Sequence, residues 1–227
     1  MDKNVQAVPA YTSADVAAEA NSVLRNTYLL LSMTLVFSSA MTAIAMILNI
    51  GHGTALVSML LALGVLWLVL PRTAQSGAGL VTVFVFTGLM GFGLGPTLNM
   101  YLKAVPHGGV LIMSALGGTG LIFGSLSVYA LTTKKDFSFM GGFLYSGLMV
   151  LIITGIGGIA AAAMGYDVSV LQLGMSAATI LVFSGLVLYD TSRIIHRGET
   201  NYIMATVELY LDILNIFLAL LRLLSRR

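Results

Sequence analysis

The chain has 227 residues, of which 58% are hydrophobic and 9% are charged, and its formal net charge is +2. This balance lies far outside that of soluble globular domains and predicts a membrane protein. The small net charge argues against a nucleic-acid partner. The absence of cysteine excludes disulfides, thiolate metal sites and cysteine nucleophiles.

Seven apolar stretches follow a polar start. About 20 residues suffice to cross the hydrocarbon as a helix, and continuous apolar runs favour helices over barrel strands. The stretches lie at residues 27–50, 54–70, 77–102, 109–131, 139–164, 170–192 and 203–224. The prediction is an all-α integral membrane protein, with a cytoplasmic tail over residues 1–26 and a seven-helix membrane domain over residues 27–227. The tail lacks the apolar core of a secretory signal, so the first stretch is expected to remain as an anchor.

Basic residues set the expected orientation, because Lys and Arg concentrate on the cytoplasmic side. One side of the predicted topology carries Lys3, Arg25, Arg72, Lys134, Lys135, Arg193 and Arg197, and the other carries Lys103. A cytoplasmic N-terminus follows. If the last segment spans fully, Arg222, Arg226 and Arg227 end on the outer side, against the rule. Either short C-terminal charges are tolerated there or that segment is re-entrant, and the full span is favoured.

Three carboxylates within the predicted spans carry most of the functional information, because a charge at mid-membrane costs at least about 2.5 kcal/mol. Asp190 closes the sixth span, and Glu208 and Asp212 open the seventh. Asp190 and Asp212 each lie 11 residues from Asn201, so antiparallel helices bring them to equal depth, at most roughly 16 Å from the turn. Two carboxylates so placed can share one proton or hold a hard cation such as Ca²⁺.

The helical repeat extends this acidic region into a stripe that must face protein or water. Its members are Glu208, Asp212, Asn215, Ala219 and Arg222. Asn215 is an auxiliary candidate, as is His196, which stands near Asp190 in the sequence.

More ordinary alternatives stay open for most of these residues. Asp190 can be a helix-end residue paired locally with Arg193 or Arg197, and Glu208 is favoured as an ordinary acid at the membrane interface. No ordinary surface role explains Asp212. Arg72 is either a partner that neutralises one of the aspartates across the bundle or only a determinant of topology.

Glycine clusters occur at GFGLGP (91–96), GGTG (117–120) and GIGG (155–158). Close helix packing is the expected use of all three, because small residues let backbones approach where lipid supplies no hydrophobic drive.

The pairing of LYDTSRIIH with ELYLDILNIFLALLRLL resembles the signature end of the transmembrane Bax inhibitor motif family. The stretches NTYLLLSMTL, GPTLNMYL, LTTKKDFSF and GETNYIMATVELY resemble its bacterial YccA-type branch, so the resemblance covers nearly the whole chain. It implies an inner-membrane bundle of six helices around a central seventh. In some members, the aspartates that match Asp190 and Asp212 form a proton-sensitive pair controlling a Ca²⁺ leak. An arginine that matches Arg72 is the latch of the closed state.

The same resemblance implies a different role for the YccA-type branch, whose members are associated with the membrane protease FtsH as substrate and negative modulator. Our first hypothesis is therefore an FtsH modulator with a di-aspartate gate, and the alternative is a pH-gated Ca²⁺ leak as the primary activity. No resident cofactor is expected beyond transient Ca²⁺ at Asp190 and Asp212.

An enzyme is the remote alternative, because Tyr189-Asp190 matches the first half of the intramembrane aspartyl protease motif. The second half, GxGD, fails at Asp212, which stands in LYLD without flanking glycines. We therefore expect no catalytic residue.

Overall fold

A computed structural model of the chain describes residues 13–133, 135–196 and 201–225. Within them the elements are α1 (Ser13–Ile47), α2 (His52–Gly64), the π-helical η1 (Val65–Val69), α3 (Leu70–Thr73), α4 (Ala78–Ala104), α5 (Gly108–Thr133), the short 3₁₀ turn η2 (Ser138–Met140), α6 (Gly141–Ala163), α7 (Ser169–His196) and α8 (Tyr202–Leu224). These residues contain no strand. The prediction of an all-α chain is confirmed.

Seven helical segments are long and apolar enough to cross a membrane. α2, η1 and α3 together form the second of them, His52–Thr73, and the other segments agree with the predicted spans within a few residues, apart from one start. That exception is α1, which begins at Ser13, inside the expected polar tail. The alanine-rich stretch SADVAAEA favours helix, which explains the extension. Residues 1–12 of the expected tail lie outside the described residues.

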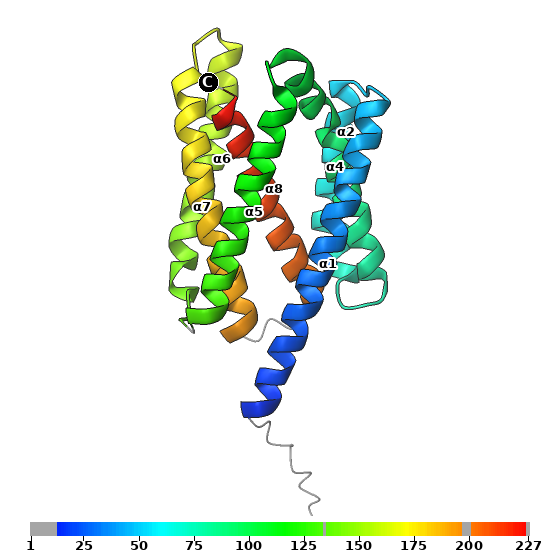
Figure 1. The fold of residues 1–227 in the computed structure, drawn as a ribbon, viewed down its shortest axis with the longest axis vertical. Helices are drawn as coiled ribbons and strands as arrows, with labels where there is room; N and C mark the ends of the chain where they lie inside the picture. The colour runs from blue at the N-terminus through cyan, green and yellow to red at the C-terminus, as the bar shows by residue number, and fades with distance from the viewer. Residues whose placement is uncertain (1–12, 134, 197–200, 226–227) are drawn as a thin grey trace, which may run out of the picture.

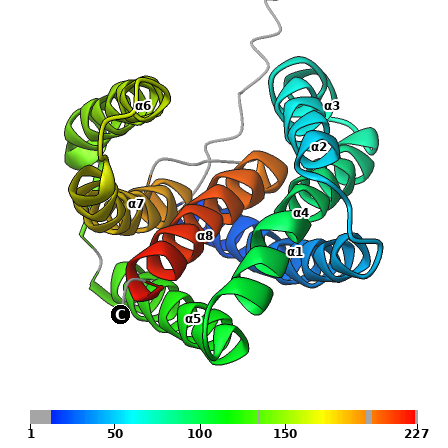
Figure 2. The same cartoon turned by 90° about the horizontal axis from the view of Figure 1, so that it is seen from above.

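α8 runs obliquely through the middle of the bundle (Figures 1 and 2), and its backbone packs against α1, α4, α5 and α7. α2 packs on α4 and α6 packs on α7, so neither outer helix lies beside α8. The expected ring of six helices around a central seventh is therefore not confirmed. α8 is one continuous helix whose end lies opposite the end of the bundle where α1 starts (Figure 1), as a full span requires.

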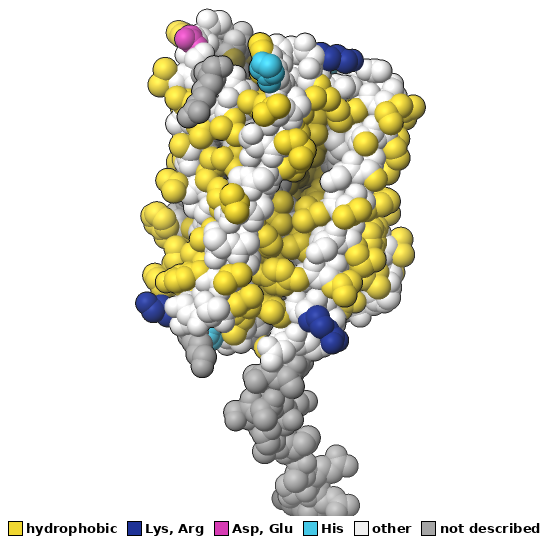
Figure 3. All heavy atoms as spheres, in the orientation of Figure 1, with side chains coloured by type: hydrophobic (Ala, Val, Ile, Leu, Met, Phe, Trp, Pro, Cys, Tyr) yellow, Lys and Arg dark blue, Asp and Glu magenta, His cyan; other side chains and the backbone are white. Residues whose placement is uncertain are grey.

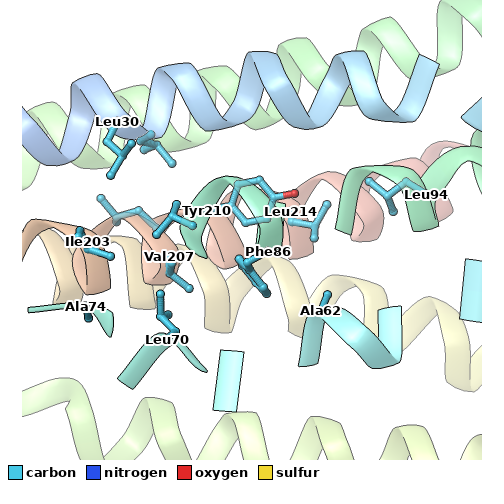
Figure 4. Packing of buried hydrophobic residues seen from close by; sticks show 13 residues of the cluster. Leu30, Ala62, Leu70, Ala74, Phe86, Leu94, Ile203, Val207, Tyr210 and Leu214 are labelled. Carbon is cyan, nitrogen blue, oxygen red and sulfur yellow. The ribbon is translucent and has the colours of Figure 1, made fainter. Parts of the chain in front are cut away.

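The first half of α8 is held by a large apolar cluster in which Val207, Tyr210 and Leu214 meet Leu70 and Phe86 (Figure 4). The rings of Phe86 and Tyr210 pack edge to face with centroids 5.9 Å apart. This burial fixes both the depth and the rotation of α8, and therefore where its acidic side chains point.

The outer surface has the polarity of a bilayer-spanning protein. Hydrophobic side chains cover the middle of the face in Figure 3, and Lys and Arg side chains lie near its two ends. Val36, Trp67, Val170 and Leu181 expose between 71% and 83% of their surface. Apolar exposure on this scale is stable in contact with lipid and unfavourable in water.

Glycines let α4 approach α1 closely. A Cβ on Gly95 would lie 2.5 Å from the Cβ of Ala45, and one on Gly91 would overlap the carbonyl of Ser38. Close packing is thus confirmed for GFGLGP. In GGTG it is not confirmed at Gly117 and Gly120, where a Cβ would meet nothing within 4 Å.

Candidate functional site at the α7–α8 hairpin

The turn between α7 and α8 is anchored by Asn201. Its side-chain oxygen accepts hydrogen bonds from the amides of Ile203 (3.1 Å) and Met204 (3.2 Å), which caps α8. Its amide nitrogen donates to the carbonyl of Ala74 at 3.1 Å. Because Asn201 ties the turn to the end of the second span, the register of the two antiparallel helices is set there.

The two aspartates predicted to face each other do meet. Asp190 is 6% exposed and Asp212 is 3% exposed, and their carboxyl groups lie within electrostatic and hydrogen-bonding range of each other. A hydrogen bond between two carboxyl groups requires a proton on one of them, since an ionised carboxylate only accepts. The second oxygen of Asp212, Oδ2, is buried and has no hydrogen-bond partner among the described residues.

Arg193 supplies the positive charge of this site. Its Nη2 donates to both oxygens of Glu208, at 2.7 and 3.0 Å, and its Nη1 lies 3.9 Å from Oδ1 of Asp190. The guanidinium therefore joins α7 to α8 beside the aspartates. Asp212 lies within electrostatic range of Glu208, and Tyr145 of α6 lies within range of Asp190. Among the residues that the structure describes, the site thus combines three acids with the guanidinium of Arg193; Arg197, the other expected partner of Asp190, lies outside them.

Arg72, the expected latch, lies elsewhere in this structure. It is exposed at the end of the second span, and its Nη1 donates to the carbonyl of Leu68 one turn earlier. The structure brings Arg193, and not Arg72, to the carboxylates. A contact of Arg72 with the pair in another state of the protein stays a prediction.

The auxiliary candidates lie near the pair without touching it. His196 is exposed, and its Nδ1 contacts the hydroxyl (3.3 Å) and carbonyl (3.2 Å) of Ser192. Asn215, one turn beyond Asp212, donates to the carbonyl of Leu211 at 2.8 Å. As expected for the polar stripe of α8, Asp212 and Ala219 are buried, whereas Asn215 lines an interhelical cleft.

The cross-helix pair of Arg193 and Glu208 was not foreseen, although the sequence contained its signal. Arg193 lies 8 residues before Asn201 and Glu208 lies 7 residues after it, so the rule that matched the aspartates also matches these two. The expectation that Glu208 is an ordinary interfacial acid overlooked this match. The local pairing of Asp190 with Arg193 is present, at the longer distance of 3.9 Å.

The arrangement is suited to moving or sharing a proton between helices. Ca²⁺ takes six to eight oxygen ligands, and two aspartates offer at most four. Within the described residues, no group of three or more His, Asp or Glu side chains has the placement to hold a metal ion. Binding of Ca²⁺ at Asp190 and Asp212 stays a prediction.

Seven candidate spans and a buried carboxyl pair between the last two helices define a multi-pass α-helical membrane protein. The chain belongs to the Bax inhibitor-1 family, because the family profile described as "Inhibitor of apoptosis-promoting Bax1" matches residues 20–227.

Relatives in other bacteria place it more narrowly. An "Uncharacterized membrane protein" of Vibrio cholerae is 48% identical, and the match covers 94% of this chain and 93% of that protein. "Modulator of FtsH protease YccA" of Escherichia coli K12 is 45% identical, and the match covers 90% of each chain. The same protein in E. coli O6:H1 is described as "Inner membrane protein YccA". The chain is thus a YccA-like membrane protein.

Proposed function

We propose that this chain modulates the membrane protease FtsH from within the bacterial inner membrane, with its N-terminus in the cytoplasm. The observation that carries the proposal is the 45% identity, over 90% of both chains, to the E. coli protein described as a modulator of FtsH. Identity of this extent supports a shared fold. The orientation is supported by the excess of Lys and Arg on the predicted cytoplasmic side.

The part of the chain offered to the protease is its N-terminal segment. α1 starts at Ser13, whereas the candidate membrane span begins at Ala20, and the start of α1 projects beyond the end of the bundle (Figure 1). A protease that pulls on this segment meets a bundle whose first helix is packed closely against α4. Such a bundle resists extraction and occupies the protease.

Reconstitution with FtsH tests this proposal. Degradation of a membrane-protein substrate by FtsH in proteoliposomes is followed with and without this chain, and we expect slower degradation when it is present. Removal of residues 2–19 leaves every candidate span intact and should abolish both the slowing and the turnover of the chain itself. An unchanged substrate rate in the presence of folded full-length chain would contradict the proposal.

The Asp190–Asp212 pair acts in this proposal as a proton-sensitive contact. Within the described ranges, the groups facing it are Arg193 from α7, Glu208 from α8 and Tyr145 from α6. With one proton shared, the two carboxyls hold α7 and α8 together. Loss of that proton leaves two like charges at low dielectric, and the resulting repulsion shifts the population toward a more open hairpin.

A pH-gated Ca²⁺ leak is the second candidate function, favoured by direct contact between the two buried aspartates. Flux into proteoliposomes is compared at pH 6 and pH 8 for the parent, Asp190→Asn and Asp212→Asn. Asp167→Asn is the matched control, because Asp167 is exposed in the loop between α6 and α7. Flux that depends on pH and on both buried aspartates supports a leak, and flux no greater than in protein-free vesicles contradicts it.

A non-enzymatic role is part of the proposal. A peptidase would need both carboxyls beside a water and open to a peptide. Neither Asp190 nor Asp212 lines the two large interhelical clefts of the structure, and the described relatives are a modulator and a membrane protein. These observations favour a conformational role for the pair.

A further inference from the structure

A cleft of about 540 Å³ is lined by α6, α7 and the second half of α8, further from the α7–α8 turn than the acid pair. It exists because α6 packs on α7 and its backbone does not reach α8 (Figure 2). Gly155 and Gly158 line the cleft on α6 and have no side chain to fill it. Asn215 and Arg222 of α8 form part of the lining.

The walls of this cleft are apolar over most of their length. On α6 they extend from Leu148 to Ala162, which corresponds to about 21 Å of helix, and the half-thickness of the hydrocarbon core is about 15 Å. Phe183 of α7 lines the deep part. The hydroxyl of Thr179 is bound to the carbonyl of Met175 at 2.8 Å, so it does not call for a polar ligand.

Arg222 supplies a positive charge at the end of the cleft that lies nearest the end of α8. Arg222 lies in the last turn of α8, is exposed, and donates from Nε to the carbonyl of Leu218 at 3.2 Å. Its two terminal nitrogens have no hydrogen-bond partner in the part of the chain that the structure describes. Arg222 is about 10 Å further along the axis than Asn215, at the depth where headgroups meet water. The expected topology puts this arginine on the side where basic residues are disfavoured.

We infer that this cleft binds one phospholipid, with its phosphate at Arg222 and an acyl chain along the α6 and α7 residues that line it. The planar guanidinium matches a phosphate with two parallel hydrogen bonds, and the apolar trough matches a chain one leaflet long. The volume lies within the roughly 300–1,000 Å³ typical of small-molecule sites. α6 exposes Ile152, Ile153, Ile156 and Ile159, so the cleft borders on lipid along its length.

This inference is independent of the proposed function, because it uses neither FtsH nor the acid pair. The bound phospholipid would hold α6, the least buried span, against the rest of the bundle. A bound chain would supply the packing that α8 supplies to α1, α4, α5 and α7.

Native mass spectrometry tests the headgroup contact. The full chain is purified in detergent with added phosphatidylglycerol, and the fraction of protein that keeps one lipid is measured. We expect Arg222→Gln to lower this fraction about tenfold, the effect of losing a charge-assisted hydrogen bond. Lys103→Gln is the matched control. It removes one positive charge at the same end of the bundle, where Lys103 contacts Asn49 and is not part of the cleft lining.

A second pair of variants tests the acyl trough. Gly155→Leu fills the cleft, and its Cβ would meet the Cε of Met175 at an ordinary 3.5 Å, so the helix itself tolerates it. Gly157→Leu adds the same side chain where nothing lies within 4 Å. The site is supported if Arg222→Gln and Gly155→Leu both lose the lipid and the two control variants keep it. Retention by either of them at the parent level, or equal loss in the controls, overturns it, and unchanged melting temperatures show that the variants are folded.

Discussion

The α1–α4 side of the bundle and the second half of α6, on the α6–α7 side, use glycine in opposite ways. On the first side, Gly93 and Gly95 stand where a Cβ would lie 2.8 Å or less from atoms of α2 and α1. On the second side, a Cβ on Gly155 would have 3.5 Å of room, and one on Gly157 would meet nothing. Near the start of α6 the contact with α7 is also close, because a Cβ on Gly185 would lie 2.5 Å from Leu144. Glycine therefore brings helices together at α1–α4 and at the start of α6, and has no such role in the second half of α6.

Burial follows the same division. α4 has buried residues from Gly79 to Tyr101, whereas in α6 the buried residues are Gly141 and Leu144, both near its start. The acid pair lies at the seam between the halves, on α7 and α8. The proton-sensitive contact that we propose would join a tightly packed half to a loosely packed half, which is the arrangement that a two-state switch requires.

The largest expected effect on stability comes from adding a side chain where α4 packs closely against α1. Gly91→Leu puts a side chain into the carbonyl of Ser38 on α1, and backbone cannot yield as a flexible side chain can. We expect a loss of about 3 kcal/mol in the free energy of unfolding, or failure to accumulate, because overpacking forces the helices apart. Thermal unfolding in detergent measures it. Gly157→Leu on the open side is the control, and an equal loss there would remove the contrast between the halves.

The contact between α7 and α8 beside the acid pair is tested by removing the guanidinium of Arg193. Arg193→Gln leaves Glu208 without its guanidinium, and both side chains are less than one-third exposed, at 18% and 30%. We expect a loss of about 1–3 kcal/mol. The double variant Arg193→Gln with Glu208→Gln should recover part of it, because the Glu208 charge is then removed together with the guanidinium that bound it. A double variant no more stable than Arg193→Gln alone would show that the pair does not join the helices.

The smallest effect on stability is expected at Asp212. In Asp212→Asn the amide can donate to Asp190 and so replaces the shared proton, which keeps the change within about 1 kcal/mol at neutral pH. Its signature is in the pH dependence. As the pH rises, the parent should lose stability when the shared proton leaves, and the stability of the variant should vary less. Parallel melting curves for the two proteins would contradict proton sharing.

Much of this site follows from chain geometry. Two residues equally far from a tight turn reach equal depth on antiparallel helices, which is why Asp190 and Asp212 could be matched from their distances to Asn201. The same reasoning reaches Arg193 and Glu208. It cannot show that Arg72 lies away from the acids. Arg72 ends the second span, which is not joined to α7 or α8 by a single turn, so distance along the chain does not fix their relative positions.

The sequence by itself determined the number of candidate spans, nearly all of their bounds and the equal distance of Asp190 and Asp212 from the turn, because these depend on the length of apolar runs and on the rise of a helix. Tertiary structure decided which glycines are packed, which arginine meets the acids, and that α6 stands away from α8. In lipid a helix is apolar on every face, so its hydrophobic pattern says little about which face meets protein. That choice comes from the shape of the helices around it.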